Sequence, residues 1–488
     1  MTKKASLVFV PAPAVGHIVS AIELAKLLIA RDDRLSIIIL LMKTPYSPTF
    51  NTFLKSLAAS VVVTGIRFVE LPQLEPPSPE MAQSIEGSVS IFIDNHKPFV
   101  KDAITQLFFT SESQTQSPLA GLVIDLFCTS MIDVANELGI PSYLFFSSTA
   151  GLLSLMLHLP ILDTQIHTDF KDSDIELLIP GFVNSVPPHV LPMPIWCKGQ
   201  DGYTWYLYHS RRFSETKGII VNTFSELEPH LISFLSSSSG RTPPVYPVGP
   251  LLDLRGQIHS QLDQTNFERI NRWLDDQPPS SVVLLCFGSG GSFGVPQVME
   301  IAHGVERSGH RFLWSLRQPS IGFNSPSDYT NVKEVLPEGF LDRTAERGLV
   351  CGWIPQVDVL GHRSIGGFVS HCGWNSTLES IWFGVPIACW PLYAEQHLNA
   401  FEMVKEMGGL MVELTLDNRG GGDDLVKAEE VERAVRRLMD PKCEVRMRIK
   451  EMQEKSRKAL MDGGSSFTSL GCLIKDILDE CVEKMEGS

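Results

Sequence analysis

The sequence has no apolar run long enough to cross a membrane and no excess of positive charge. Its longest apolar stretch, Gly151 to Leu162, falls short of about 18 residues and contains His158. The first apolar run of the chain is cut by Pro11 and Pro13, which argues against a signal peptide. With 56 acidic and 41 basic residues the net charge is -15, so nucleic acid and anionic membranes are poor partners, since both require a concentrated basic face.

The sequence also lacks a Cys-x-x-Cys pair, although it contains nine cysteines. An odd number of cysteines without paired spacing is typical of reduced thiols. This pattern favours a cytoplasmic protein over a disulfide framework or a zinc site.

A complete dinucleotide-binding glycine fingerprint is absent as well. The loop Gly288 to Gly294 follows an apolar strand expected at Ser281 to Phe287, but Phe293 stands where G-x-G-x-x-G needs its third glycine. The next expected strand, Arg311 to Leu316, ends without the acid that would bind a ribose. These departures exclude a nicotinamide dehydrogenase, whereas a phosphate-facing loop with Ser289 as a donor stays possible.

The chain does contain the same strand, loop and helix order twice. A buried-type strand at Leu7 to Val10 precedes a helix from about Ile18 to Ala30, and the strand before Gly288 precedes a helix from about Pro296 to Gly309. We therefore expect an α/β fold of two similar halves, each with its own core. The expected bounds are an N-terminal domain at 1–240, a Pro- and Gly-rich linker at 241–256 and a C-terminal domain at 257–465.

Two polar residues follow apolar strands of the N-terminal half. His17 lies where the loop after the first strand meets its helix, and Asp125 ends a strand expected at Gly121 to Asp125. Open parallel sheets bind ligands at this carboxyl edge. Position alone leaves two alternatives open, because a lone histidine is often structural and an acid at a strand end is often a helix cap.

The strongest chemical signal is a 44-residue stretch from Trp353 to Gln396. A strand expected at Gly367 to Ser370 runs into His-Cys-Gly-Trp-Asn-Ser and then into a helix expected at Thr377 to Trp382. Free backbone N–H groups at the start of a helix suit a phosphate. Within this stretch the candidate phosphate contacts are His371, Asn375 and Ser376, Glu379 can accept from a ribose, and Trp353 can stack on a base.

This stretch closely resembles the donor-binding signature of plant family 1 UDP-sugar-dependent glycosyltransferases, which begins with Trp, ends with Gln and has HCGWNS at its centre. The resemblance implies the glycosyltransferase B fold, in which two facing Rossmann-like domains hold the acceptor and the UDP-sugar. It also implies that a final helix, at 466–488, crosses back to the N-terminal domain. We expect a monomer that uses UDP-glucose as co-substrate, without a metal or other cofactor.

The resemblance also assigns roles to matching positions. In the family the uracil base stacks on the residue matching Trp353, and the residues matching Gln356 and Glu379 bind the ribose. The residues matching His371, Asn375 and Ser376 bind the diphosphate. The residues matching Trp374, Glu395 and Gln396 hold the sugar. The implied donor-binding residues are Ser289, Trp353, Ile354, Gln356, His371, Trp374, Asn375, Ser376, Glu379, Glu395 and Gln396. Glu395 departs from the family, which more often has Asp there, and Gln396 favours UDP-glucose.

In the same family a Gly-His turn carries the catalytic base, and an acid in the context Asp-x-Phe-Cys bonds to it; His17 and Asp125 match these positions. The resemblance implies an inverting displacement that adds a β-glucosyl group to a hydroxyl of a flavonoid, another phenolic or a terpenoid. Asp172 and Asp174 form an Asp-x-Asp sequence, which binds a metal with the diphosphate in the other main glycosyltransferase fold. Here we expect a solvated loop.

Two other functions are compatible with part of the sequence. A non-catalytic nucleotide-sugar-binding protein would keep the signature but would not need His17 and Asp125. A hydrolase built on His371 and Cys372 is a poor alternative, because neighbours on an extended strand point to opposite faces. The Leu- and Met-rich segment Thr149 to Leu159 is either core or one wall of an acceptor pocket, and 161–208 is expected to be an irregular, aromatic rim.

Overall fold

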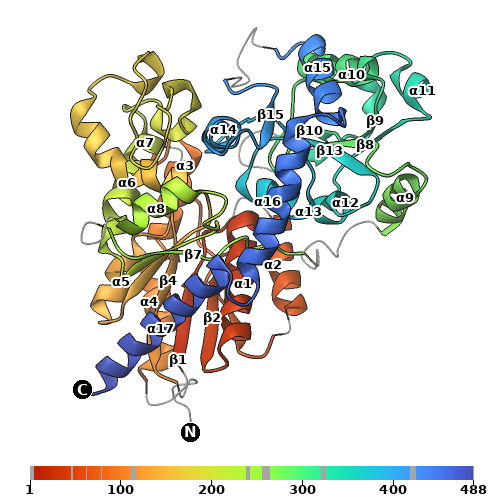
Figure 1. Cartoon of the computed structure of the whole chain (residues 1–488). Helices are drawn as coiled ribbons and strands as arrows, with labels where there is room; N and C mark the ends of the chain where they lie inside the picture. The colour runs from red at the N-terminus through yellow and green to blue at the C-terminus, as the bar shows by residue number, and fades with distance from the viewer. Residues whose placement is uncertain are drawn as a thin grey trace.

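The computed structural model describes residues 5–44, 48–61, 63–78, 80–110, 117–237, 242–254, 264–319, 326–417 and 425–486. Two parallel sheets, one in each half of the chain, are packed between helices (Figure 1). The predicted α/β class with two Rossmann-like domains is therefore confirmed. No helix among the described residues is long and apolar enough to cross a membrane.

The first sheet has seven parallel strands in the order β3-β2-β1-β4-β5-β6-β7. Its central strands are mostly Val, Ile, Leu and Phe, as expected where helices cover both faces of a sheet. The strands are β1 (Ala5–Val10), β2 (Leu35–Leu41), β3 (Ile66–Glu70), β4 (Leu119–Asp125), β5 (Ser142–Phe146), β6 (Gly218–Val221) and β7 (Val245–Pro247). The helices of this half are α1 (Val15–Arg31), α2 (Pro48–Ser60), α3 (Ile85–Asp94), α4 (Lys97–Phe108), α5 (Met131–Glu137), α6 (Ala150–Gln165), α7 (Asp201–Arg212) and α8 (Pro229–Ser237).

The second sheet has six parallel strands in the order β12-β9-β8-β13-β14-β15. They are β8 (Val282–Cys286), β9 (Arg311–Ser315), β12 (Gly348–Cys351), β13 (Ile365–Ser370), β14 (Ile387–Cys389) and β15 (Met411–Glu413), beside a short antiparallel pair of β10 (Arg317–Gln318) and β11 (Ser327–Asp328). The helices are α9 (Gln264–Asp275), α10 (Val295–Ser308), α11 (Phe340–Thr344), α12 (Gln356–Leu360), α13 (Trp374–Phe383), α14 (Gln396–Phe401), α15 (Ala428–Met439), α16 (Glu444–Leu460) and α17 (Ser465–Glu486), with a π-helix at Glu402–Glu406.

Both sheets therefore repeat one winding pattern. In the first sheet the order of connection reverses between β1 and β4, and in the second it reverses between β8 and β13. Ligands of such folds bind outside the carboxyl ends of the strands at this reversal. We therefore expect a ligand-binding site at the segments that follow these four strands.

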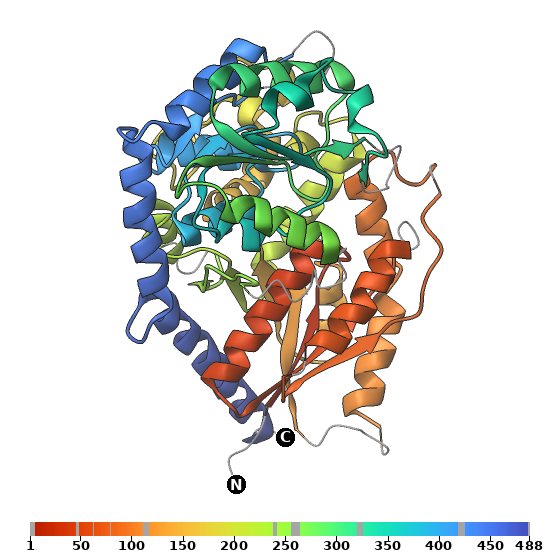
Figure 2. The same ribbon diagram turned by 90° about the vertical axis from the view of Figure 1, so that its right-hand side faces the viewer.

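Helix α17 follows the second sheet in sequence but packs on the first. Its Leu473 and Ile477 are fully buried in the same apolar core as Leu7 and Ile37. In Figure 2 α16 and α17 run along one side of the molecule, from the C-terminal half to the N-terminal half. The helix expected at 466–488 corresponds to α17, and residues 487 and 488 lie outside the described residues.

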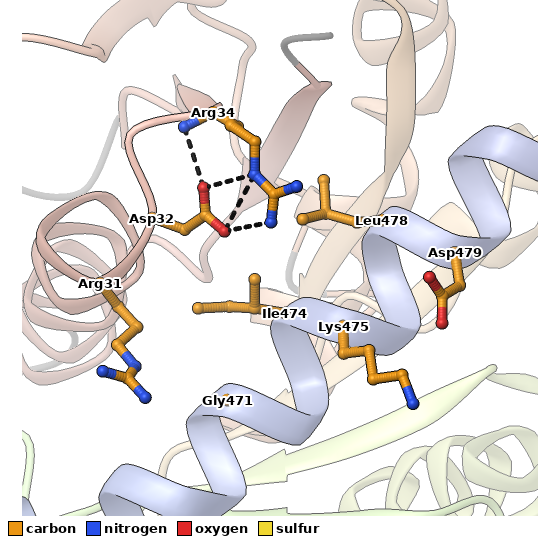
Figure 3. A pocket seen from close by; sticks show the side chains of 8 residues that line it. All are labelled: Arg31, Asp32, Arg34, Gly471, Ile474, Lys475, Leu478 and Asp479. Carbon is orange, nitrogen blue, oxygen red and sulfur yellow. Dashed lines mark hydrogen bonds and ion pairs between the residues drawn. The ribbon is translucent and has the colours of Figure 1, made fainter. Parts of the chain in front are cut away.

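A cavity of about 320 Å³ lies between the C-terminal end of α1 and α17. On one side of the cavity Arg34 is hydrogen-bonded to Asp32, and on the other side Lys475 extends from α17 (Figure 3). Because α1 rises about 1.5 Å per residue, this cavity is roughly 20 Å from the first turn of α1. It is separate from the edge at which the sheets reverse.

Two segments differ from the sequence-based expectation. Within the expected linker, residues 245–247 form β7 and pair with β6, because extending the sheet satisfies their backbone groups; residues 241, 255 and 256 lie outside the described residues. The expected irregular rim was wrong at both ends: α6 continues to Gln165, and Tyr203, Trp205 and Tyr206 lie on α7. Tyr203 and Tyr206 are three residues apart on the buried face of that helix, so tertiary packing decided its conformation.

Candidate active site

His17 and Asp125 meet at the reversal point of the first sheet. His17 lies in the first turn of α1, after β1, and Asp125 is the last residue of β4. The Nδ1 atom of His17 is 2.8 Å from Oδ2 of Asp125, and the backbone N–H of Phe127 donates to Oδ1 at 3.1 Å. The Oγ atom of Ser147, at the end of β5, is 3.3 Å from the same Nδ1. With Nδ1 engaged, Nε2 is the ring nitrogen available to a substrate.

The surroundings of this pair favour a protonated histidine. Asp125 is only 2% exposed, while a quarter of the His17 side chain is accessible to solvent. Burial lowers the pKa of His17, but the charge and hydrogen bond of Asp125, together with the charge of Glu395, outweigh it and the pKa is raised. Glu395 belongs to the C-terminal half, so both halves contribute to the electrostatics of one imidazole.

The reversal point of the second sheet is the turn between β13 and α13. Strand β13 ends at Ser370, Cys372 has a left-handed φ of 64°, and Gly373 caps the helix. The helix starts at Trp374, so the expected start at Thr377 was wrong by three residues. Its first turn consequently contains Trp374, Asn375 and Ser376, and their backbone N–H groups are the unsatisfied donors that suit a phosphate.

His371 is enclosed by glycines on both sides. A Cβ atom on Gly288 or Gly373 would lie 2.5 or 2.6 Å from its Nε2, so only glycine leaves room for the ring. Burial lowers the pKa of His371 to about 4, and its Nδ1 is buried without a hydrogen-bond partner among the described residues. A neutral imidazole with an unsatisfied nitrogen can exchange a hydrogen bond with a ligand oxygen.

Gln356, Ser376 and Glu379 form one hydrogen-bonded group. The Nε2 atom of Gln356 donates to Oγ of Ser376 at 2.8 Å and to Oε2 of Glu379 at 2.7 Å. Burial raises the pKa of the Glu379 carboxyl to about 7. Three residues predicted to bind the donor are thus in direct contact, although they come from two helices.

The side chains of Trp374 and Asn375 connect the two halves. The indole N–H of Trp374 donates to the backbone oxygen of Asn222 at 2.6 Å. The Nδ2 atom of Asn375 donates to the oxygen of Gly16 at 3.4 Å, and Ser20 donates to its Oδ1 at 3.3 Å. The start of α13 is therefore bonded to the turn that carries His17, a contact that the sequence did not reveal.

The other predicted donor residues line the approach to this turn. Ser289 is exposed in the loop after β8, Trp353 is partly exposed after β12, and Ile354 is buried. The Gln396 side chain accepts the backbone N–H groups of residues 392 and 393, both at 3.0 Å, and so shapes the loop before α14. Glu395, next to it, is half-buried, and burial raises the pKa of its carboxyl.

Phe127 and Tyr206 lie beside the histidine and were not identified as site residues. The ring of Phe127 is 5.7 Å from that of His17, and 6.0 Å from that of Tyr206 in an edge-on arrangement. Phe127 belongs to the Asp-x-Phe-Cys sequence, which was the available signal. Tyr206 had no local signal, because α7 brings it to the site from 81 residues further along the chain than Asp125.

The structure also bears on two alternatives, a hydrolase built on His371 and Cys372 and a metal site at Asp172 and Asp174. Cys372 is not on an extended strand, so the reason given against a hydrolase was wrong. Burial nevertheless raises the pKa of its thiol, which makes it a poor nucleophile. Asp172 and Asp174 are exposed, in agreement with a solvated loop, and the described residues contain no group of three His, Cys, Asp or Glu able to hold a metal ion.

Comparisons with known proteins agree with this geometry. A family model for UDP-glucoronosyl and UDP-glucosyl transferase matches residues 241–451. UDP-glycosyltransferase 71K1 of Malus domestica is 52% identical over 483 residues, which cover 98% of this chain and 100% of that protein. UDP-glucose flavonoid 3-O-glucosyltransferase 6 of Fragaria ananassa is 51% identical over 494 residues, covering 98% and 99%.

A solved structure is similar over the same extent. The crystal structure of Medicago truncatula UGT71G1 complexed with UDP-glucose has a TM-score of 0.87 and 48% identity, and the match covers 97% of this chain and 98% of that one. The likeness includes both sheets, so it supports the two-domain architecture as well as the donor stretch. Because the identity extends over nearly the whole length, the chain belongs to the UDP-glucoronosyl and UDP-glucosyl transferase family and is a UDP-sugar-dependent glycosyltransferase with the glycosyltransferase B fold.

Proposed function

We propose that the protein is an inverting glucosyltransferase that moves a glucosyl group from UDP-glucose to a hydroxyl of a small apolar plant metabolite. The observation that carries the proposal is the His17–Asp125 pair, 2.8 Å apart, next to Gly16, whose backbone oxygen accepts from Asn375 in the first turn of α13. A base and an anion-binding helix start are the two parts that this displacement requires. Donor identity is supported by the related Medicago enzyme, which was crystallised with UDP-glucose.

In the proposed mechanism, Nε2 of His17 removes the proton of the acceptor hydroxyl. The oxygen forms a bond to the anomeric carbon while the bond from that carbon to the diphosphate oxygen breaks, and UDP leaves with the electron pair. Asp125 holds the Nδ1 proton and stabilises the imidazolium, in agreement with the raised pKa of His17. A single displacement converts an α-linked donor into a β-glucoside.

The donor is proposed to lie along the second sheet. Its diphosphate would be held by the N–H groups of the first turn of α13 with His371 and Ser289, so that helix, rather than a metal ion, offsets the charge of the leaving group. Gln356 and Glu379 would bind the ribose, Trp353 and Ile354 the uracil, and Glu395 and Gln396 the glucose. Trp374 would position the sugar through its contact with Asn222.

The acceptor is proposed to be a flavonoid, another phenolic or a terpenoid. One related protein is a flavonoid 3-O-glucosyltransferase, and Phe127 and Tyr206 place aromatic rings beside His17. The Leu- and Met-rich start of α6 is buried, which supports its interpretation as core more than as an exposed wall. We further propose a cytoplasmic protein, on the basis that none of the nine cysteines, all of which are described, forms a disulfide. We also propose that it is a monomer.

The test is an assay of the purified protein with UDP-glucose and a panel of flavonols, simple phenols and triterpenols in the presence of EDTA. Wild type is compared with His17→Ala and with His167→Ala, an exposed histidine of the same half. We expect a hexose adduct by mass spectrometry in wild type and in the control, and its loss in His17→Ala. Donor binding without any adduct would favour a non-catalytic nucleotide-sugar-binding protein, and adducts that survive in His17→Ala would refute the assignment of the base.

A further inference from the structure

Two buried carboxyl groups face each other where the halves of the molecule meet. Glu228 lies in the N-terminal half, just before α8, and Glu402 is the first residue of the π-helix that follows α14 in the C-terminal half. Both side chains belong to residues that are 0% exposed. Burial of an unpaired carboxylate is costly, so this arrangement requires a compensating interaction.

Both carboxyl groups converge on the start of α6. The backbone N–H of Gly151 donates to Oε1 of Glu228 at 3.0 Å. Thr149, the residue that caps this helix, donates its hydroxyl to Oε1 of Glu402 at 3.1 Å and accepts the N–H of Leu152 at 2.8 Å. The positive end of a 16-residue helix therefore stabilises negative charge at this point.

The hydrogen bonds to the two carboxyl groups leave one oxygen of each group without a donor. Among the described residues, the Oε2 atoms of Glu228 and Glu402 have no hydrogen-bond partner. Both carboxyl groups nevertheless reach Gly151: Oε1 of Glu228 accepts its N–H, and a Cβ atom on this glycine would lie 2.7 Å from Oε2 of Glu402. Two carboxylates have no proton to share. A single proton between them would satisfy both atoms and leave one negative charge for the helix.

The environment indicates which residue carries the proton. Burial raises the pKa of both groups, but hydrogen bonding from the backbone at the start of α6 opposes this at Glu228. At Glu402 the charge of Glu228 adds to the effect of burial, so its pKa lies well above the usual range. Glu406 is a further charged group that acts on Glu402, and it raises the same pKa.

We propose that Glu228 and Glu402 share one proton across the interface, and that this carboxyl–carboxylate bond positions the donor-binding half against the acceptor-binding half. Neither residue is a catalytic residue. Helix α6 follows Ser147, which contacts His17, and Glu402 directly follows α14, which begins at Gln396. The bond therefore connects the catalytic turn to the donor-binding segment, a role in catalysis that rests on the proposed function.

Gly151 supports the proposal from the packing side. A Cβ atom at this position would lie 2.2 Å from Oε1 of Glu402, so only glycine allows the acid of the other half to reach the helix start. The residue lies in the first turn of α6, although alanine has the higher helix propensity. The close approach of Glu402 explains its presence.

The first experiment measures thermal and urea unfolding between pH 5 and pH 9 for wild type and Glu402→Gln, with Glu451→Gln, an exposed acid of α16, as the matched control. A carboxyl whose pKa is raised on folding binds one proton more in the folded state, so its contribution to stability is lost as pH rises from its ordinary pKa to the raised one. Relative to Glu402→Gln, the wild-type unfolding constant should therefore increase about tenfold per pH unit over this window.

The remaining variants separate the two roles. Glu228→Gln removes the charge at the start of α6 and should lower the melting temperature at every pH, whereas Glu402→Gln keeps a neutral donor and should exceed wild type at high pH. Infrared spectroscopy at pH 7 should show a protonated-carboxyl band in wild type that loses the intensity of one carboxyl in Glu402→Gln, while the contribution of Glu379 stays the same. Parallel pH dependence of wild type and Glu402→Gln, or an unchanged infrared band, would overturn the proposal.

These measurements use no substrate, so they stand even if the proposed function fails. Where the enzyme is active, Glu402→Gln should retain kcat near neutral pH and should flatten the loss of kcat/KM at alkaline pH. If kcat/KM does not change in parallel with the stability of either variant, the two glutamates have no positioning role in catalysis. The proposal of a shared proton would still hold.

Discussion

The replacement Asp125→Asn tests how the orientation of the imidazole controls catalysis. Oδ1 of Asp125 accepts the N–H of Phe127 at 3.1 Å, and an asparagine must keep its oxygen there, because its amide group cannot accept from that donor. The new N–H group then points at Nδ1 of His17, in place of the oxygen 2.8 Å away. The imidazole is forced to accept at Nδ1 and to carry its proton on Nε2.

A histidine protonated on Nε2 cannot remove a proton from the acceptor. We therefore expect kcat/KM to fall to the level of His17→Ala, by about 10²- to 10⁴-fold, the usual contribution of a general base. The substitution also removes the charge that raises the pKa of His17. Activity requires the unprotonated base, so the acidic limb of any residual pH profile should move to lower pH.

The assay compares kcat/KM from pH 5 to pH 9 for wild type, Asp125→Asn and His17→Ala. Thermal unfolding serves as the control, since loss of a buried hydrogen bond to a charged group costs about 1.5–3 kcal/mol and must not unfold the protein. Activity of Asp125→Asn within a few fold of wild type, with an unmoved acidic limb, would refute the reasoning about the tautomer.

Three further predictions follow from other contacts. Because the pKa of Glu379 is about 7, its carboxylate forms as pH rises through neutrality, so the KM for UDP-glucose should fall over this pH range. Glu379→Gln should abolish this pH dependence and raise KM about tenfold. An unchanged KM would contradict the assignment of Glu379 to the ribose. Gly151→Ala should destabilise the protein by about 1–3 kcal/mol in urea unfolding, because its Cβ meets Glu402; a neutral effect would show that the acid can move away. Trp374→Phe should cost about 0.5–1.5 kcal/mol of stability through the lost bond to Asn222, and no change would mean that water replaces that bond.

Much of the fold was predictable because its signals are local. The apolar runs of β1 and β8 and the small-residue loops after them lie within about 20 residues of their helices, and both were identified. The errors arose where packing decides conformation. Helix α7 has few apolar residues for its length, and its buried tyrosines pack against distant elements, so 161–208 could not be assigned from local pattern alone.

The candidate site shows the same division. The donor residues lie in one 44-residue stretch apart from Ser289, so the resemblance of that stretch to a family signature was sufficient to assign them. Their contacts were not: Trp374 reaches Asn222, 152 positions earlier, and Asn375 reaches Gly16, 359 positions earlier. Such contacts depend on how two separately folded sheets approach each other.

The sequence by itself determined the α/β class and the two strand–loop–helix units, because hydrophobic periodicity and turn chemistry act over a few residues. The donor stretch and the two catalytic candidates were assigned through the resemblance of their residues to a known family. Only the tertiary structure decided that Phe127 and Tyr206 flank His17 and that Glu228 and Glu402 meet at the start of α6. These outcomes depend on burial and on electrostatic coupling between residues far apart in the chain. Glu402 acquires its raised pKa because packing removes water and brings the charge of Glu228 beside it.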